Sequence, residues 1–232
     1  MSPVRSWLQR SLWEVVPRDH RETPTALRRR QLVTLGFVLI GAVVLGLSLR
    51  IEPGSPWFYP ATFGLAGVWA LGAFCSGPLH LGRIARRGEL VRPWATPVAL
   101  GVGLAALFVV GGLVVRELPW LSGQVSSVLD FADQGSVPLL VVITAVNGVA
   151  EELFFRGAAY AAIPRHPVVW TTLAYGVATL ATGNVMLSFA ALLLGVVVGL
   201  ERRASGGILA PILTHCTWSL SMLLVLPLVF GA

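Results

Sequence analysis

The sequence predicts an all-α fold, a polytopic helical membrane bundle of about seven transmembrane helices with its N-terminus in the cytoplasm. Three observations predict this class. Of the 232 residues, 55% are hydrophobic and 12% are charged, and the mean hydropathy is positive, which excludes an ordinary soluble domain. Seven apolar segments are long enough to cross or nearly cross the hydrocarbon layer. The arginines also gather on one side of these segments, as the positive-inside rule expects.

The expected spans are residues 32–49, 57–79, 94–115, 137–161, 168–182, 185–200 and 207–229. All 17 basic residues are arginine. With the N-terminus inside, only Arg50 and Arg116 fall in outer connections. Missing or adding one span would scatter the arginines over both faces. The asymmetry therefore predicts an odd number of spans, with the C-terminus outside, in a multi-pass protein of the cell membrane.

The chain is long enough for one bundle, which we divide into a basic N-terminal segment 1–31, a first set of helices with an outer loop 32–136, and a C-terminal core 137–232. Apolar and basic residues alternate in the N-terminal segment, from Arg5 to Val16. This pattern fits a short helix on an anionic membrane surface, and a disordered basic tail is the alternative. The outer loop 116–136 fits either an interfacial helix or a plain loop.

Charged residues interrupt the fourth span at Asn147-Gly-Val-Ala-Glu-Glu-Leu-Phe-Phe-Arg-Gly157. Each charge near a bilayer centre costs roughly 2.5–3.5 kcal/mol, and intramembrane charges usually serve function. Glu152 and Arg156 stand one helical turn apart, so they can pair. Glu151 points away, on the stripe shared with Asn147, and is expected to lack a partner. An unpaired carboxylate of this kind is suited to act as a general base.

Polar residues of two other spans lie at the same depth. Glu151, Thr179 and His215 fall ~12–16 Å from the cytoplasmic ends of their helices at 1.5 Å per residue. Ser219 follows His215 by one turn. A glutamate facing a histidine across a damp pocket favours hydrolysis, in which the carboxylate takes a proton from water and the imidazole stabilises the oxyanion.

Other chemistries are less well supported. A zinc site needs at least three protein ligands, and the sequence offers His215 and one glutamate at this depth, without a His-Glu-x-x-His motif. We therefore predict no metal and no other cofactor. The net charge of +6 is explained by topology, and no nucleic-acid-binding pattern accompanies it.

These residues resemble the CPBP family, the type II CAAX prenyl proteases and bacteriocin-processing or immunity proteins also called ABI. Its first motif, Glu-Glu-x-x-x-Arg, is met by Glu151, Glu152 and Arg156. In its second motif, Phe-x-x-x-His, Thr179 replaces the histidine. In its third motif, His-x-x-x-Asn, His215 is present and Ser219 replaces the asparagine. The resemblance covers about 137–222.

The resemblance implies an intramembrane endopeptidase in which Glu151 activates water and His215 clamps the oxyanion. The expected catalytic set is Glu151, Glu152, Arg156 and His215, with support from Thr179, Ser219 and Asn147. The substrate would be a hydrophobic peptide or membrane-protein segment. Because Thr179 cannot accept a proton at neutral pH, reduced activity is expected. The alternatives are a non-catalytic protein of the same fold that binds peptides or a partner, and a small transporter that uses Glu151 as a proton carrier.

Overall fold

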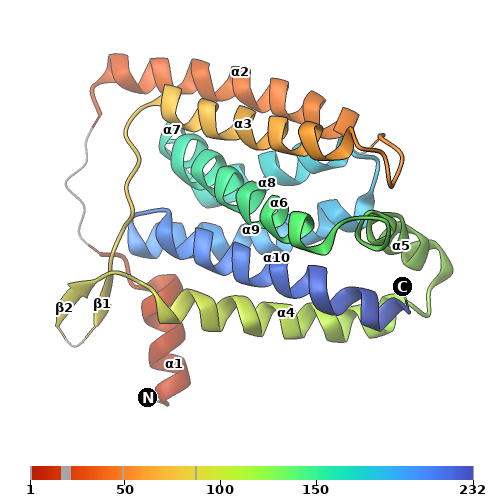
Figure 1. The fold of residues 1–232 in the computed structure, drawn as a ribbon. Helices are drawn as coiled ribbons and strands as arrows, with labels where there is room; N and C mark the ends of the chain where they lie inside the picture. The colour runs from red at the N-terminus through yellow and green to blue at the C-terminus, as the bar shows by residue number, and fades with distance from the viewer. Residues whose placement is uncertain (1, 17–21, 49, 87, 232) are drawn as a thin grey trace.

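The computed structural model describes residues 2–16, 22–48, 50–86 and 88–231, and it shows a helical bundle (Figure 1). Three of the arginines that the predicted topology places on the cytoplasmic side, Arg18, Arg21 and Arg87, lie outside the described residues. Among these described residues, six helical rods are long and apolar enough to span a membrane: α2 (Pro24–Ser48), α3 (Phe58–Ser76), α4 (Ala95–Val115), α6 with its extension (Val137–Ala162), α9 (Val185–Ser205) and α10 (Leu209–Phe230). The multi-pass membrane class predicted from the sequence is therefore confirmed.

The seventh expected span, 168–182, is a shorter apolar helix, α8 (Pro167–Leu180). Its 14 residues extend about 21 Å at 1.5 Å per residue, less than the hydrocarbon thickness of about 30 Å. Helix α2 also begins at Pro24, earlier than the predicted residue 32. The pattern of apolar residues predicted where the helices lie, but it did not show that this helix is shorter than the hydrocarbon layer is thick.

Helix α6 (Val137–Glu152) lies at the centre of the bundle (Figure 1). It packs against α3 on one side and α10 on the other, while the pairs α2–α3, α4–α10 and α8–α9 pack together around it. After Glu152 the rod continues as the π-helical segment η2 (Leu153–Ala159) and the short helix α7 (Tyr160–Ala162). π-Helical turns inside α-helices often mark functional sites, and this one begins directly after the two glutamates.

An aromatic cluster joins α3 to this central rod. Trp69 is 1% exposed and its ring lies 4.8 Å from that of Phe154 and 5.1 Å from that of Phe155. Two glycines make room for these rings. A Cβ at Gly41 would lie 2.0 Å from Trp69, and one at Gly72 would lie 2.7 Å from Phe37 and 2.8 Å from Phe154. The cluster therefore fixes the η2 segment against α2 and α3.

The N-terminal segment packs against protein. Helix α1 (Pro3–Leu8) and segment η1 (Gln9–Trp13) lie at the end of the bundle where α9 ends (Figure 1). Leu12 and Val16 are buried, and the Val16 amide donates to the Ala204 carbonyl at 3.1 Å. The short helix predicted there is present, and segment η1 packs against α9.

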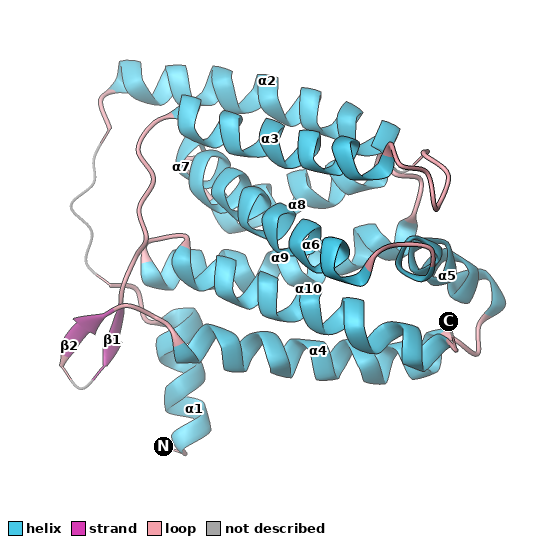
Figure 2. Ribbon diagram, viewed as in Figure 1, coloured by secondary structure: helices cyan, strands magenta, loops and turns pink. Residues whose placement is uncertain are grey.

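The connections contain two further elements. The outer loop forms helix α5 (Pro119–Asp133), in keeping with the interfacial-helix alternative. A hairpin of β1 (Ile84–Arg86) and β2 (Glu89–Val91) was not expected (Figure 2). The segment that leads into this hairpin is hydrogen-bonded to the turn between α9 and α10. There the amides of Ile208 and Leu209 donate to the carbonyls of His80 and Leu81.

Replacing Gly72 by alanine should lower the melting temperature, because the new methyl group meets Phe37 and Phe154 in a packed core. Overpacking of this kind costs about 1–3 kcal/mol. The measurement is thermal unfolding of the purified protein in detergent. Gly67→Ala is the matched control, since a Cβ at Gly67 in the same helix meets nothing within 4 Å. Equal melting temperatures for the two variants would contradict this account of the α2–α3 packing.

Candidate active site

The two glutamates are placed where α6 approaches α10 closely. Gly148, one turn before Glu152, faces α10 at this point. A Cβ on Gly148 would crowd Cys216 Sγ at 3.3 Å and would make an ordinary contact with His215 Cδ2 at 3.6 Å. Gly148 therefore lies directly against the turn of α10 that carries His215.

Glu152 is the centre of a buried ionic cluster. Its side chain is fully buried, and Arg156 Nη1 donates to its Oε1 at 3.1 Å. This is the i,i+4 ion pair expected from the sequence. His215 Nδ1 lies 2.8 Å from the same oxygen. One carboxylate oxygen thus joins the guanidinium of the central rod to the imidazole of α10.

Glu151 has a partner, contrary to the sequence-based expectation. The Tyr175 hydroxyl of α8 donates to Glu151 Oε2 at 2.5 Å. His215 Nε2 lies 4.0 Å from the same oxygen. The Glu151 side chain is 17% exposed, whereas that of Glu152 is not exposed at all. His215 therefore stands between a carboxylate that retains access to its surroundings and one that is sealed in the core.

Tyr175 is the site residue that sequence reasoning missed. Its ring lies 4.9 Å from that of Phe155 and 5.0 Å from the Arg156 guanidinium carbon. The ring thus closes one side of the ionic cluster while its hydroxyl holds Glu151. The signal was present, because Tyr175 occupies the phenylalanine position of the second motif and carries a hydroxyl group that phenylalanine lacks.

The three expected supporting residues bond to their own helices. Thr179 Oγ1 donates to the Tyr175 carbonyl at 2.8 Å, and Ser219 Oγ donates to the Cys216 carbonyl at 3.4 Å. The Asn147 amide donates to the Ile143 carbonyl at 3.0 Å. The contacts described above join the four residues expected to be catalytic, whereas these three donate to main-chain carbonyls of their own helices.

Helices α8 and α9 enclose the guanidinium of Arg156, which is fully buried. A Cβ on Gly195 would lie 3.1 Å from Arg156 Nη2 and 3.1 Å from Thr172 Cγ2. Arg202 Nε donates to the Arg156 carbonyl at 2.6 Å. Arg202 was assigned to a cytoplasmic connection from the sequence. It lies instead in the last turn of α9, 6% exposed, where it is hydrogen-bonded to the central rod.

The site chemistry is that of carboxylates, an imidazole and a phenol. Within the part of the chain that the structure describes, His, Cys, Asp and Glu side chains nowhere gather in a group of three or more that could hold a metal ion. What the cluster offers is a partly accessible carboxylate beside an imidazole whose far nitrogen is fixed by a second carboxylate. This arrangement can take up a proton and stabilise an oxyanion.

Replacing Arg156 by glutamine should destabilise the protein strongly, by about 3–5 kcal/mol, because it removes the guanidinium that neutralises a buried carboxylate. The control is Arg116→Gln, which breaks the Arg116–Glu117 pair, whose side chains are 46% and 71% exposed. Exposed pairs contribute about 0–1 kcal/mol. Thermal unfolding of both variants checks the contrast, and a comparable small loss for both would show that the buried pair is not needed for the fold.

Comparison with known proteins gives one match. A family model described as type II CAAX prenyl endopeptidase Rce1-like matches residues 133–221. No curated protein and no solved structure matches the chain. The matched segment runs from the end of α5 into α10, so it contains both glutamates, Arg156, Tyr175 and His215. For residues 133–221, the match supports the family resemblance that was predicted from the motifs of this segment.

Proposed function

We propose that this protein is an intramembrane endopeptidase that hydrolyses a peptide bond of a membrane-associated peptide or protein by glutamate-activated water. The observation that carries the proposal is the position of His215, whose two ring nitrogens face two different glutamates. Its Nδ1 lies 2.8 Å from Glu152 and its Nε2 lies 4.0 Å from Glu151. The substrate would be cut on the arginine-rich, cytoplasmic side of a cell membrane.

Glu151 is the proposed base. A water molecule beside its carboxylate gives one proton to the glutamate, and the water oxygen attacks the carbonyl carbon of the substrate. The carbonyl oxygen becomes an oxyanion in the tetrahedral intermediate. When the C–N bond breaks, the proton held by Glu151 passes to the leaving nitrogen. Partial exposure of Glu151 supports this role, because the fully buried Glu152 has no comparable access.

His215 and Glu152 act as a pair in this scheme. In the proposed scheme both ring nitrogens carry a hydrogen, and Nδ1–H donates to Glu152, which fixes the orientation of the imidazole. Nε2–H then donates toward the substrate oxyanion. Arg156 balances the charge of Glu152 at 3.1 Å. Glu152 and Arg156 are therefore positioning residues that act through His215.

Tyr175, and not a residue at position 179, makes the polar contact to Glu151 in the proposed site. The family places an imidazole at position 179, where this chain has a threonine bonded to its own backbone. The polar contact to Glu151 comes from one turn earlier, at Tyr175. A phenol can orient the carboxylate but does not accept a proton at neutral pH. The proposed enzyme is accordingly slower than one that has the histidine.

A second candidate is a non-catalytic protein of the same fold that binds hydrophobic peptides or a partner. It is favoured by the hydrogen bonds that Thr179 and Ser219 make. Thr179 and Ser219 replace two motif residues, and both donate to main-chain carbonyls of their own helices. Peptide binding without cleavage in the assays below would favour this candidate over the protease.

Replacing Glu151 by glutamine should lower the rate of peptide cleavage by about 10²–10⁴-fold, because the amide cannot take the proton from water. Cleavage of a fluorogenic hydrophobic peptide library in detergent measures the rate. Glu52→Gln, at an exposed position outside the site, is the control. Thermal unfolding should show that both variants fold. If Glu151→Gln cleaved as well as the parent protein, Glu151 would not be the base.

Replacing Tyr175 by phenylalanine should lower kcat by about 10–100-fold, the kinetic equivalent of one hydrogen bond to a charged group. KM should stay nearly constant, because the aromatic ring that packs on Phe155 and Arg156 is retained. The control is Tyr59→Phe, which loses a hydroxyl that accepts from the Ser136 amide in a distant loop. Unchanged kcat in Tyr175→Phe would remove Tyr175 from the proposed mechanism.

A further inference from the structure

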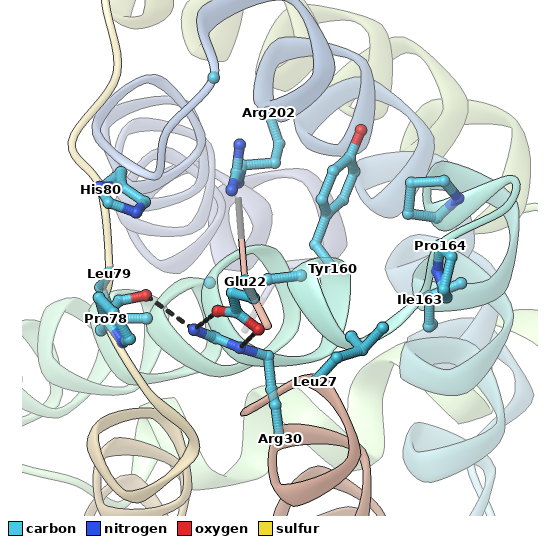
Figure 3. A pocket seen from close by; sticks show the side chains of 14 residues that line it. Glu22, Leu27, Arg30, Pro78, Leu79, His80, Tyr160, Ile163, Pro164 and Arg202 are labelled. Atoms are coloured by element: carbon cyan, nitrogen blue, oxygen red, sulfur yellow. Dashed lines mark hydrogen bonds and ion pairs between the residues drawn. The ribbon is translucent and has the colours of Figure 1, made fainter. Parts of the chain in front are cut away.

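A polar cavity and an apolar cavity lie outside the Glu151–His215 cluster. The polar cavity lies where α2 begins (Figure 3). Its Arg30 is paired with Glu22 and also donates to Ser76 and to the Pro78 carbonyl, so this guanidinium needs no further ligand. The apolar cavity has a volume of about 600 Å³ and lies between α4, α5, α9 and α10. It is the better candidate for a ligand site.

The apolar cavity offers a ligand almost no polar contacts. Aliphatic and aromatic side chains form most of its walls, among them Leu107, Phe108, Leu193 and Met222. Among the described residues that line it, none carries a charge. The polar lining residues Gln124, Asn184 and Ser219 are already hydrogen-bonded within the protein. A ligand of this cavity is therefore held by van der Waals packing, and it has to be apolar itself.

The cavity is closed at both ends along the bundle. Towards the middle of the bundle, Leu104 of α4 packs together with Leu194 and Val198 of α9. At the other end lies α5, at the side of the bundle where α4 ends and α9 begins (Figure 1). Asn184 Nδ2 donates to the Gln124 carbonyl of α5 at 2.6 Å. This bond ties α5 to the start of α9 and holds the end wall in place.

The cavity opens sideways, between α4 and α9. Leu107 of α4 and Phe189 of α9 line it and are also 62% and 51% exposed. Both helices are long and apolar enough to span a membrane. The opening therefore faces the hydrocarbon of the bilayer and not water.

These dimensions and walls exclude two classes of occupant. From Leu107 to Val115 the α4 wall is about 12 Å long at 1.5 Å per residue, whereas a membrane-spanning helix of a partner needs about 30 Å. An extended peptide would bring main-chain N–H and C=O groups against walls that have few partners for them. A hydrocarbon chain carries no such groups, and it is the material that surrounds the opening.

We propose that this cavity binds an acyl chain of a membrane phospholipid, which enters sideways between α4 and α9. The lipid belongs to the leaflet beside α5, which is the outer leaflet in the predicted topology. Inside a bilayer, close packing selects such a chain, because lipid tails are as apolar as the walls. The headgroup stays at the interface, and since the walls are uncharged it does not decide which lipid binds.

The inner end of the cavity adjoins the candidate active site. Ser219, one turn after His215, lines it, and so does Trp218. The Trp218 ring lies 6.1 Å from the imidazole ring of His215. A bound acyl chain therefore packs beside the ring that contacts His215. Lipid binding does not require the proposed proteolysis, so the two proposals can fail independently.

The test is retention of dioleoyl phosphatidylcholine by the purified full chain, followed by native mass spectrometry while detergent removes loosely bound lipid. Gly111 of α4 lines the cavity, and a Cβ there meets nothing within 4 Å. Gly111→Leu should therefore fill the cavity without disturbing the packing, and it should lose the lipid that the parent protein retains. Gly103→Leu is the matched control, because Gly103 lies on the same helix, also meets nothing within 4 Å and does not line the cavity.

Gly103→Leu should retain the lipid as the parent protein does, and Gly111→Ala should retain an intermediate fraction. Thermal unfolding should show that all three variants fold. Dioleoyl phosphatidylglycerol should be retained as well as phosphatidylcholine, because the headgroup lies outside the cavity. Equal retention by Gly111→Leu and Gly103→Leu would overturn the proposal, and so would a parent protein that retains no phospholipid. A hydrophobic peptide that displaces the retained lipid would overturn it in favour of a substrate site.

Discussion

Three ionisable side chains meet at one oxygen atom, Glu152 Oε1, inside a membrane bundle. Arg156 Nη1 lies 3.1 Å from this oxygen and His215 Nδ1 lies 2.8 Å from it. Each of these groups alone would be costly at this depth, at roughly 2.5–3.5 kcal/mol for a charge near the bilayer centre. Together they neutralise one another, and they can do so only if α6 and α10 hold a fixed separation. The arrangement of the other helices serves this contact.

Small residues set that separation. Gly148 lies against Cys216 of α10, where a Cβ would be crowded at 3.3 Å, and Gly195 makes room for the guanidinium of Arg156 between α8 and α9. The π-helical segment η2 begins at Leu153, and its extra residue per turn turns the following side chains relative to those of α6. Phe154 and Phe155 thereby face the buried Trp69, while Arg156 still reaches Glu152. Packing and electrostatics thus depend on the same few turns of helix.

The sequence predicted the parts of this arrangement that follow from spacing within one element. The Glu152–Arg156 pair follows from a separation of four residues, and six of the seven predicted spans follow from apolar length. The Tyr175–Glu151 contact could not be predicted in this way, because it depends on the rotation of α8 about its axis. That rotation is fixed by packing against α9, where Leu192 would meet any side chain placed at Gly176. The burial of Arg202 was missed for a related reason. An arginine near a helix end is as consistent with a solvated loop as with a buried side chain that donates to a main-chain carbonyl of another helix.

In the proposed mechanism, Tyr175 supplies one contact to Glu151 in the motif whose histidine is replaced by Thr179. A histidine at position 179 would offer a proton acceptor, whereas the Thr179 hydroxyl donates a hydrogen bond to the main-chain carbonyl one turn earlier. The hydroxyl of Tyr175 supplies a hydrogen bond to Glu151 from the same helix. That bond fixes the direction of the carboxylate, which a general base needs. It supplies no second base, so in the proposed mechanism proton uptake rests on Glu151 alone. The rate would then be limited by how well His215, fixed by Glu152, stabilises the oxyanion.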